Sequence, residues 1–340
     1  MSLATKAYNF IIYNRLVKRL AGWFLRQRFF NQNYFYQQKY QRLLKNKMGK
    51  YQRVPFRVMI ENTNACNSNC VFCPHPAMKR KIGNMSMELF QKIVDQCVSL
   101  GIDYVTIYGF GEPLLDPEFV AKVKYAKSRG IKRVTTNTNG ALLTEERSRA
   151  LVEAGIDEIY ISFDAATAET FRKIRPALNF DKIEKNIFDL ARIRKEMGSK
   201  KPEIVLSFVE TGDNKQEVKK YIKKWQKTVD HISISFIHNW TGDLFDKLKI
   251  KQRDWLRDPC RLIWTDMVIS WDGTVPLCCN DYENKIILGD INKQTVAEVW
   301  GGEKLRQFRY YHQKGEFKSI NICADCVYNC HHKSPWWVGK

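Results

Sequence analysis

The chain has 340 residues, with 56 Lys and Arg against 36 Asp and Glu, and a formal net charge of +20 at pH 7. Several of its ten cysteines stand three or four positions apart, a spacing typical of metal sites and not of the disulfide framework of a small secreted protein. No uninterrupted apolar run approaches the roughly 20 residues of a membrane-spanning helix. Composition therefore argues against a disulfide-stapled secreted protein and an integral membrane protein, and we expect a reducing, cytoplasmic compartment.

Residues 1–54 form the most basic part of the chain, because no Asp or Glu precedes Glu61. Bulky apolar residues alternate there with Lys and Arg at helical intervals, which fits a helix lying on an anionic surface such as the inner face of the cell membrane. The same pattern fits a helix docked on the flank of the protein or, less well, a segment that binds nucleic acid. Arg15, Lys18 and Arg19 interrupt the apolar stretches, so we expect no secretory signal.

Cys66, Cys70 and Cys73 follow a strand-like run at 56–60 as C-x3-C-x2-C. Thiolates at this spacing on one loop can face a single iron–sulfur cube and leave one iron without a protein ligand. A structural zinc site is the alternative, although zinc sites usually supply paired C-x2-C units that complete a tetrahedron. The spacing therefore favours an iron–sulfur cluster with one open iron.

Between residues 57 and 239, short apolar runs alternate with helical patterns. We expect strands at 56–60, 105–108, 134–136, 159–164, 204–209 and 231–237. We expect helices at 87–100, 117–129, 144–154, 180–197 and 215–227. This alternation predicts about six parallel βαβ units, which suit an open (β/α)6 barrel in the α/β class better than an eight-fold barrel of roughly 250 residues. In such barrels the chemistry gathers at the carboxyl ends of the strands.

Polar motifs stand at the ends of three of these expected strands. They are the sequence G-F-G-E-P at 109–113, Asn139 and Ser162. Glycines in the first motif let main chain approach a neighbouring group closely, although a lone motif of this kind can also be a plain β-turn. Asn139 and Ser162 have an equally simple alternative, which is to cap the following helix.

Together with Phe72 before the last cysteine, these motifs resemble the radical S-adenosylmethionine (SAM) superfamily, whose fold is an open (β/α)6 barrel. The resemblance implies a [4Fe–4S] cluster on Cys66, Cys70 and Cys73, with the open iron chelated by the amino and carboxylate groups of SAM. It implies that an electron from a reductant such as flavodoxin or ferredoxin cleaves SAM to a 5'-deoxyadenosyl radical, which abstracts a carbon-bound hydrogen from the substrate. It also implies a set of SAM-binding residues, namely Phe72, Phe110, Gly111, Glu112, Pro113, Asn139 and Ser162.

The cysteines return after residue 240, at Cys260, Cys278, Cys279, Cys323, Cys326 and Cys330. The pattern Cys260-x12-Gly273-x4-Cys278, followed by a C-x2-C pair, resembles the SPASM domain of radical SAM enzymes or its shortened twitch form. The resemblance implies one auxiliary [4Fe–4S] cluster, with the ligands Cys260, Cys278, Cys323 and Cys326. Zinc held by the same four sulfurs is the competing hypothesis.

Three local patterns accompany these cysteines. Residues 271–274 are expected to form a hairpin turn. Residues 288–291 and 296–300 resemble the usual turn and short helix of a SPASM domain.

Three cysteines remain outside the two ligand sets. Cys97 lies on the apolar face of an expected helix, so we expect it in the core. Cys279 or Cys330 could replace one of the four auxiliary ligands. Cys330 is also a candidate hydrogen-atom donor to a product radical, and no other residue of the sequence marks a catalytic acid or base.

We therefore expect three parts: a basic helical segment at 1–54, a radical SAM partial barrel at 55–240 and a SPASM/twitch domain at 241–340. The resemblance implies a radical SAM oxidoreductase. The first sixty residues lack the strand pattern of a peptide-recognition domain, which favours oxidation or epimerisation of a small polar or sugar-like substrate, phosphate- or lipid-linked given the basic segment. Peptide maturation is the alternative within the family, and a zinc-stabilised nucleic-acid-binding protein is the alternative of another class.

Overall fold

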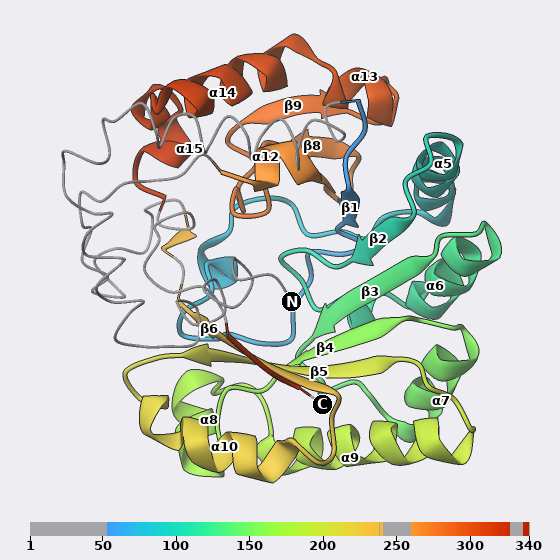
Figure 1. Cartoon of the computed structure of the whole chain (residues 1–340), viewed down its shortest axis with the longest axis vertical. Helices are drawn as coiled ribbons and strands as arrows, with labels where there is room; N and C mark the ends of the chain where they lie inside the picture. Colours follow the sequence, from blue (N-terminus) through green and yellow to red (C-terminus); the bar gives the residue numbers. More distant parts are fainter. Residues whose placement is uncertain (1–52, 238, 241–259, 327–335, 340) are drawn as a thin grey trace, which may run out of the picture.

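The computed structural model describes residues 53–237, 239–240, 260–326 and 336–339 (Figure 1). The basic helical segment expected at 1–54 falls outside these ranges except for its last two residues. Cys330 also lies outside them. Within them, no helix is both long enough and apolar enough to cross a membrane.

In the described part of the chain, one sheet contains the six parallel strands that the sequence predicts, with one further strand at each edge. Its order is β10-β6-β5-β4-β3-β2-β1-β7. The six central strands are β1 (Arg57–Ile60), β2 (Tyr104–Ile107), β3 (Arg133–Thr138), β4 (Glu158–Ser162), β5 (Glu203–Glu210) and β6 (His231–Phe236). Each pairs in parallel with the next strand along the chain, which confirms the open (β/α)6 barrel.

Helices cover the outer side of this sheet (Figure 1). They are α5 (Met87–Ser99), α6 (Phe119–Ser128), α7 (Glu145–Glu153), α8 (Ala168–Ile174), α9 (Phe180–Glu196) and α10 (Val218–Trp225). Ser86, Thr144 and Asn179 cap α5, α7 and α9, because each side chain accepts a hydrogen bond from the backbone N–H three residues later. Cys97 lies fully buried on α5, as the sequence predicts.

Side chains of the strands alternate between the helix-covered core and the inside of the barrel. In β4, Ile159 and Ile161 are fully buried in the main apolar core. Glu158, Tyr160 and Ser162 are half-buried on the opposite face, because successive residues of a strand point to opposite sides. The inner face of the barrel is therefore polar, and Ser162 stands at its carboxyl end.

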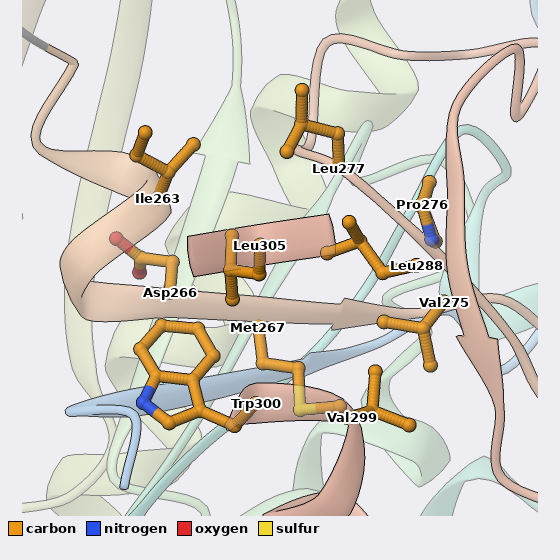
Figure 2. A pocket seen from close by; sticks show the side chains of 10 residues that line it. All are labelled: Ile263, Asp266, Met267, Val275, Pro276, Leu277, Leu288, Val299, Trp300 and Leu305. Carbon is orange, nitrogen blue, oxygen red and sulfur yellow. The ribbon is translucent and has the colours of Figure 1, made fainter. Parts of the chain in front are cut away.

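The C-terminal part is smaller than the barrel, and its buried apolar side chains, such as Trp264 and Val299, join the apolar core of the barrel. Its elements are α12 (Leu262–Thr265), β7 (Asp266–Ile269), β8 (Thr274–Pro276), β9 (Ile287–Asp290), α13 (Val296–Trp300), α14 (Glu303–Lys314) and α15 (Asn321–Ala324). Figure 2 shows side chains from β7, β8, β9, α13 and α14 that meet across a space lined almost wholly by apolar groups. This space is too narrow for a water molecule, so it is core and not a binding site.

A turn is present at 271–274, but it does not join two paired strands of a hairpin: it passes the chain from one sheet to the other. The N–H of Gly273 donates to Ser270 O at 2.9 Å, and the N–H of Ser270 donates to Thr274 O at 2.8 Å. Gly273 has φ +91°, and a Cβ there would lie 2.3 Å from Asn292 Nδ2, so this position requires glycine. Before the turn β7 pairs with β1, whereas after it β8 pairs with β9.

Residues 288–290 belong to strand β9, so the turn expected at 288–291 is wrong for most of its length. The glycine within this strand, Gly289, serves packing. A Cβ on Gly289 would lie 2.6 Å from a side-chain atom of Val299, so glycine lets α13 pack directly on β9. The short helix expected at 296–300 is confirmed as α13.

Two strands of the C-terminal part extend the barrel sheet. β7 adds in parallel to β1, and β10 (Trp336–Gly339) adds antiparallel to β6. The sheet therefore crosses the domain boundary expected at residue 240. Each added strand pairs with the free backbone groups that the edge of a six-stranded open barrel would leave exposed.

Candidate active site

The loop after β1 places Cys66, Cys70 and Cys73 together. Cys70 is buried, the other two are half-buried, and the N–H of Cys73 donates to Cys70 O at 3.1 Å. Burial, with smaller contributions from neighbouring cysteines, raises the pKa of Cys66 to about 11 and that of Cys73 to about 12. Three soft donors that repel one another when ionised fit a cationic iron–sulfur cluster, which displaces their protons on binding.

Arg175, which follows α8, lies against this loop. Its guanidinium donates to Cys70 Sγ at 3.1 Å and to Asp164 Oδ2 at 2.6 Å, and it lies 5.6 Å from the centre of the Phe72 ring. Burial disfavours the charged form, but Asp164 and the Cys70 thiol hold the pKa of Arg175 above its ordinary value. A buried cation is thus in contact with one of the three sulfurs. The sequence reasoning missed this residue.

The G-F-G-E-P loop is bonded directly to the cysteine loop. The N–H of Glu112 donates to Ala65 O at 2.7 Å. A Cβ on Gly111 would lie 2.5 Å from the carbonyl oxygens of both Ala65 and Thr63, so only glycine allows the two loops to approach this closely. The glycine therefore makes room for protein main chain beside the cysteines.

The carboxylate of Glu112 joins the same loop to the end of β3. It accepts hydrogen bonds from Thr138 Oγ1 at 2.6 Å, from the N–H of Asn139 at 2.7 Å and from the N–H of Leu114 at 3.2 Å. Burial raises the pKa of Glu112, although these hydrogen bonds act in the opposite direction. Pro113 is buried beside it at the start of a short 3-10 helix.

Asn139 and Ser162 lie at the same edge of the sheet. Asn139 Nδ2 donates to Asn67 Oδ1 at 2.7 Å, which ties the end of β3 to the cysteine loop. Its Oδ1 accepts from the N–H of Ala141 at 3.0 Å in a local turn, whereas Thr144 and not Asn139 caps the following helix α7. Ser162 is half-buried at the end of β4 and pairs in register with Ser207 of β5.

Phe72 and Phe110 are linked through Trp240, which stands after β6. Trp240 Nε1 donates to Phe72 O at 2.7 Å, and its ring centre lies 5.7 Å from that of Phe110. The Phe110 ring also meets Tyr282 of the C-terminal part at 6.0 Å. Aromatic groups from three distant segments thus cover the junction between the two loops.

A run of four buried polar residues between β1 and Cys66 holds these parts together, and the sequence reasoning missed it. Glu61, Asn62, Thr63 and Asn64 are each at most 2% exposed. Glu61 accepts two hydrogen bonds from Arg80, at 2.9 and 2.8 Å, and others from the N–H groups of Phe110 and Trp271. The sequence signal for this role was available: four consecutive polar residues stand between a strand and the cysteine loop.

The C-terminal cysteines within the described residues lie near Cys278. Burial raises the pKa of Cys278 well above its ordinary value, and the nearby thiols of Cys279, Cys260, Cys323 and Cys326 raise it further. The backbone N–H of Cys260 donates to His312 Nδ1 at 3.1 Å, which fixes that end of the group on α14. Among the residues that the structure describes, no three His, Cys, Asp or Glu side chains are arranged to hold a single metal ion.

Cys279 has a different environment from its neighbour Cys278. Burial raises its pKa to about 12, and beyond burial the largest influences are Asp266, which raises it, and Arg57, which lowers it. Cys279 therefore lies beside the Arg57–Asp266 ion pair as well as near Cys260. This placement favours Cys278 as the ligand of the two.

Two family models match the chain. Residues 60–224 match the radical SAM superfamily, and residues 260–327 match an iron–sulfur cluster-binding domain, SPASM. The chain therefore belongs to the radical SAM superfamily and carries a SPASM domain after its barrel. Its cofactors are accordingly SAM, a [4Fe–4S] cluster in the barrel and auxiliary iron–sulfur binding in the SPASM domain.

Similar proteins cover most of the chain. One is the tungsten-containing aldehyde ferredoxin oxidoreductase cofactor-modifying protein of Pyrococcus furiosus, 26% identical over 78% of this chain and 86% of that protein. Another is the S-adenosyl-L-methionine-dependent 2-deoxy-scyllo-inosamine dehydrogenase of Niallia circulans, 24% identical over 79% and 91%. The crystal structure of BtrN in complex with AdoMet and 2-DOIA superimposes with a TM-score of 0.57 at 22% identity, covering 80% of this chain and 93% of that one, which shows a shared fold.

Proposed function

We propose that this radical SAM enzyme is an oxidoreductase that abstracts a carbon-bound hydrogen from a small polar or sugar-like substrate, giving oxidation or epimerisation. The observation that carries the proposal is the 2.7 Å hydrogen bond from the Glu112 N–H to Ala65 O, because it fixes the G-F-G-E-P loop beside the three cysteines. A molecule bound to a cluster on those cysteines would also meet this loop. The substrate class is supported by the dehydrogenase relative, whose name specifies an aminocyclitol and which aligns over 91% of its length.

The residues of the barrel have separate tasks in this proposal. Cys66, Cys70 and Cys73 hold the cluster, and Arg175 supplies a positive charge against the sulfur of Cys70. When bound, the cluster and SAM together supply a 5'-deoxyadenosyl radical, using one electron from a reductant such as flavodoxin or ferredoxin. The chain's own contribution is to position the cofactor and substrate and to keep water away.

Cofactor positioning falls to loops at the carboxyl ends of β2, β3 and β4. We assign Phe110, Gly111, Glu112 and Pro113 to the methionine end of SAM, with Asn139 and Ser162 on the neighbouring strands. Phe72 and Phe110, bridged by Trp240, exclude water from the side that faces the C-terminal part. A reducing, cytoplasmic compartment suits these groups.

The C-terminal domain binds one auxiliary [4Fe–4S] cluster through Cys260, Cys278, Cys323 and Cys326 in this proposal. That cluster either accepts the second electron of an oxidation or shapes the substrate pocket. Glu61 connects the C-terminal part directly to the G-F-G-E-P loop at 109–113, which we call the cofactor loop. Its carboxylate accepts a hydrogen bond from the N–H of Phe110 in that loop and another from the N–H of Trp271 in the C-terminal part.

The test uses anaerobically reconstituted enzyme, SAM, a reductant and aminocyclitols carrying deuterium at each ring carbon in turn. We expect deuterium from one position to appear in 5'-deoxyadenosine. Loss of two hydrogens from the substrate would indicate oxidation, and uptake of one solvent hydrogen into an otherwise unchanged compound would indicate epimerisation. Transfer from a peptide but from no aminocyclitol or sugar would overturn the substrate class. A colourless protein that holds zinc and leaves SAM intact would overturn the whole proposal.

A further inference from the structure

Lys122 on α6 is a fully buried cation that lies behind the cofactor loop. Its side chain is 0% exposed. The ammonium donates to Asp116 Oδ2 at 2.7 Å and to Met85 O at 2.6 Å, and it lies 3.7 Å from the carboxylate of Glu118. A buried ammonium is tolerated only when acceptors surround it, so this site is built around the charge.

Asn62 connects Asp116 to the cofactor loop at 109–113. The amide nitrogen of Asn62 donates both to Asp116 Oδ2 at 3.0 Å and to the carbonyl oxygen of Pro113 at 3.0 Å. The orientation of the amide is fixed, because a flipped amide would bring its oxygen against two acceptors. Among the described residues, no donor forms a hydrogen bond with Asn62 Oδ1, which is buried. The amide therefore keeps its two donated hydrogen bonds although its buried oxygen is left without one, which costs free energy.

The resulting chain of contacts runs from Lys122 through Asp116 and Asn62 to Pro113. Its far end is the residue that follows Glu112, whose own N–H is bonded to the cysteine loop. Asn62 itself stands only four residues before Cys66. The chain of contacts therefore holds the cofactor loop through the carbonyl group of Pro113.

We propose that Lys122, Asp116 and Asn62 are positioning residues that hold the 109–113 loop in the conformation that binds SAM. The inference rests on the proposed role of that loop in SAM binding. The network acts through Pro113, and among the described residues its side chains make no hydrogen bond to Cys66, Cys70 or Cys73. Its loss therefore affects SAM binding while cluster assembly is retained.

The helix supplies a matched control. Lys127 lies five residues later on α6 and also joins an aspartate and main-chain carbonyls, donating to Asp157 Oδ2 at 2.7 Å and to Ile131 O at 3.1 Å. Asp157 precedes β4, so this second lysine serves the amino end of the sheet. Lys122→Met and Lys127→Met remove the same group from opposite ends of one helix.

The experiment compares reconstituted full-length wild type with Lys122→Met, Asn62→Ala, Lys127→Met and Gly111→Ala. The measurements are iron content, melting temperature, the dissociation constant of SAM and the electron paramagnetic resonance spectrum of the reduced cluster with and without SAM. For Lys122→Met and Asn62→Ala we expect unchanged iron content and SAM binding weakened about tenfold. The spectral change on SAM addition should need correspondingly more SAM. Lys127→Met should bind SAM like wild type. Asn62→Ala keeps the ion pair and is the informative variant if Lys122→Met does not fold.

Three results separate the possible failures. SAM affinity unchanged in Asn62→Ala and Lys122→Met but weakened in Gly111→Ala would overturn this inference and leave the loop's role intact. Unchanged affinity in all of them would overturn the loop's role as well. Equal weakening by Lys122→Met and Lys127→Met would show a general loss of helix packing and would also overturn the inference.

Discussion

The two ends of the barrel are both polar, but their polar groups do different things. At the amino end, charged side chains pair with one another. Arg57 pairs with Asp266, Arg133 makes two bonds to Glu158 at 2.6 and 2.9 Å, and the hydroxyl of Tyr160 donates to Glu158 at 2.9 Å. These polar groups therefore have their partners within the amino end itself.

At the carboxyl end, most hydrogen bonds run from side chains to the main chain of neighbouring loops. Asn64 binds Lys81 O and the N–H of Gly83, both at 2.9 Å, and Glu112 binds the N–H of Asn139. Burial raises the pKa values of the Cys66 and Cys73 thiols. The polar groups of the amino end thus pair with one another without a ligand. The carboxyl end instead holds its loops around three cysteine thiols that a metal cluster would use. The following experiments test this division, from the largest expected effect to the smallest.

Removal of a cluster thiol should have the largest effect. We expect Cys70→Ala to lose the barrel cluster and to form 5'-deoxyadenosine only at the uncatalysed rate, a fall of at least about 10⁶-fold. Cys97→Ala makes the same change in the core of α5 and should keep both the cluster and the activity. Iron and sulfide analysis with chromatography of 5'-deoxyadenosine measures both outcomes. An active Cys70→Ala enzyme would contradict the assignment of this loop.

The adjacent pair Cys278 and Cys279 sharpens the comparison inside the C-terminal domain. Cys278→Ser should lose the auxiliary cluster, so that iron per chain falls by about half. Cys279→Ser should keep full iron, because this thiol lies beside the Arg57–Asp266 pair at the amino end. Iron analysis and Mössbauer spectroscopy distinguish the two variants. The opposite result would make Cys279 the ligand.

Arg175 should set the reduction potential of the barrel cluster. Reduction adds negative charge to a site that three thiolates already make anionic, and a cation donating to Cys70 Sγ favours the reduced form. In Arg175→Met we expect the equilibrium constant for reduction to fall about tenfold, which is about 59 mV for one electron. Potentiometric titration followed by paramagnetic resonance measures the shift. Arg194→Met breaks a different, partly buried ion pair, the one with Asp230, and should leave the reduction potential unchanged.

The sequence predicted those features that depend on neighbouring residues. Short apolar runs between helical patterns located β1 to β6, and the cysteine spacing located the loop that gathers three thiols. Capping by Ser86 and Thr144 depends on a residue three positions away, so helix starts were also accessible.

Features that depend on distant contacts could not be read in this way. Arg175 meets Cys70 across 105 positions, and Trp271 meets Glu61 across 210. No local pattern encodes such pairs, because they arise only when the barrel and the C-terminal part have folded. The turn expected at 288–291 failed for a related reason: the resemblance that suggested it is local, whereas the small size of Gly289 serves contact with Val299 of a later helix.

The amino end should tolerate loss of one of its pairs with the smallest effect. The Arg133 side chain is 44% exposed, so solvent screens its interaction with Glu158 and the pair contributes less than about 1 kcal/mol. Arg133→Met keeps an apolar side chain next to the Tyr104 ring, over which the guanidinium lies at 4.4 Å. We therefore expect a slightly lower melting temperature, with SAM affinity, iron content and 5'-deoxyadenosine formation like wild type. Calorimetry and the SAM-cleavage assay measure these quantities. If Arg133→Met weakened SAM binding as strongly as a change in the 109–113 loop, the two ends of the barrel would be coupled, and the amino end would have to be treated as part of the active site.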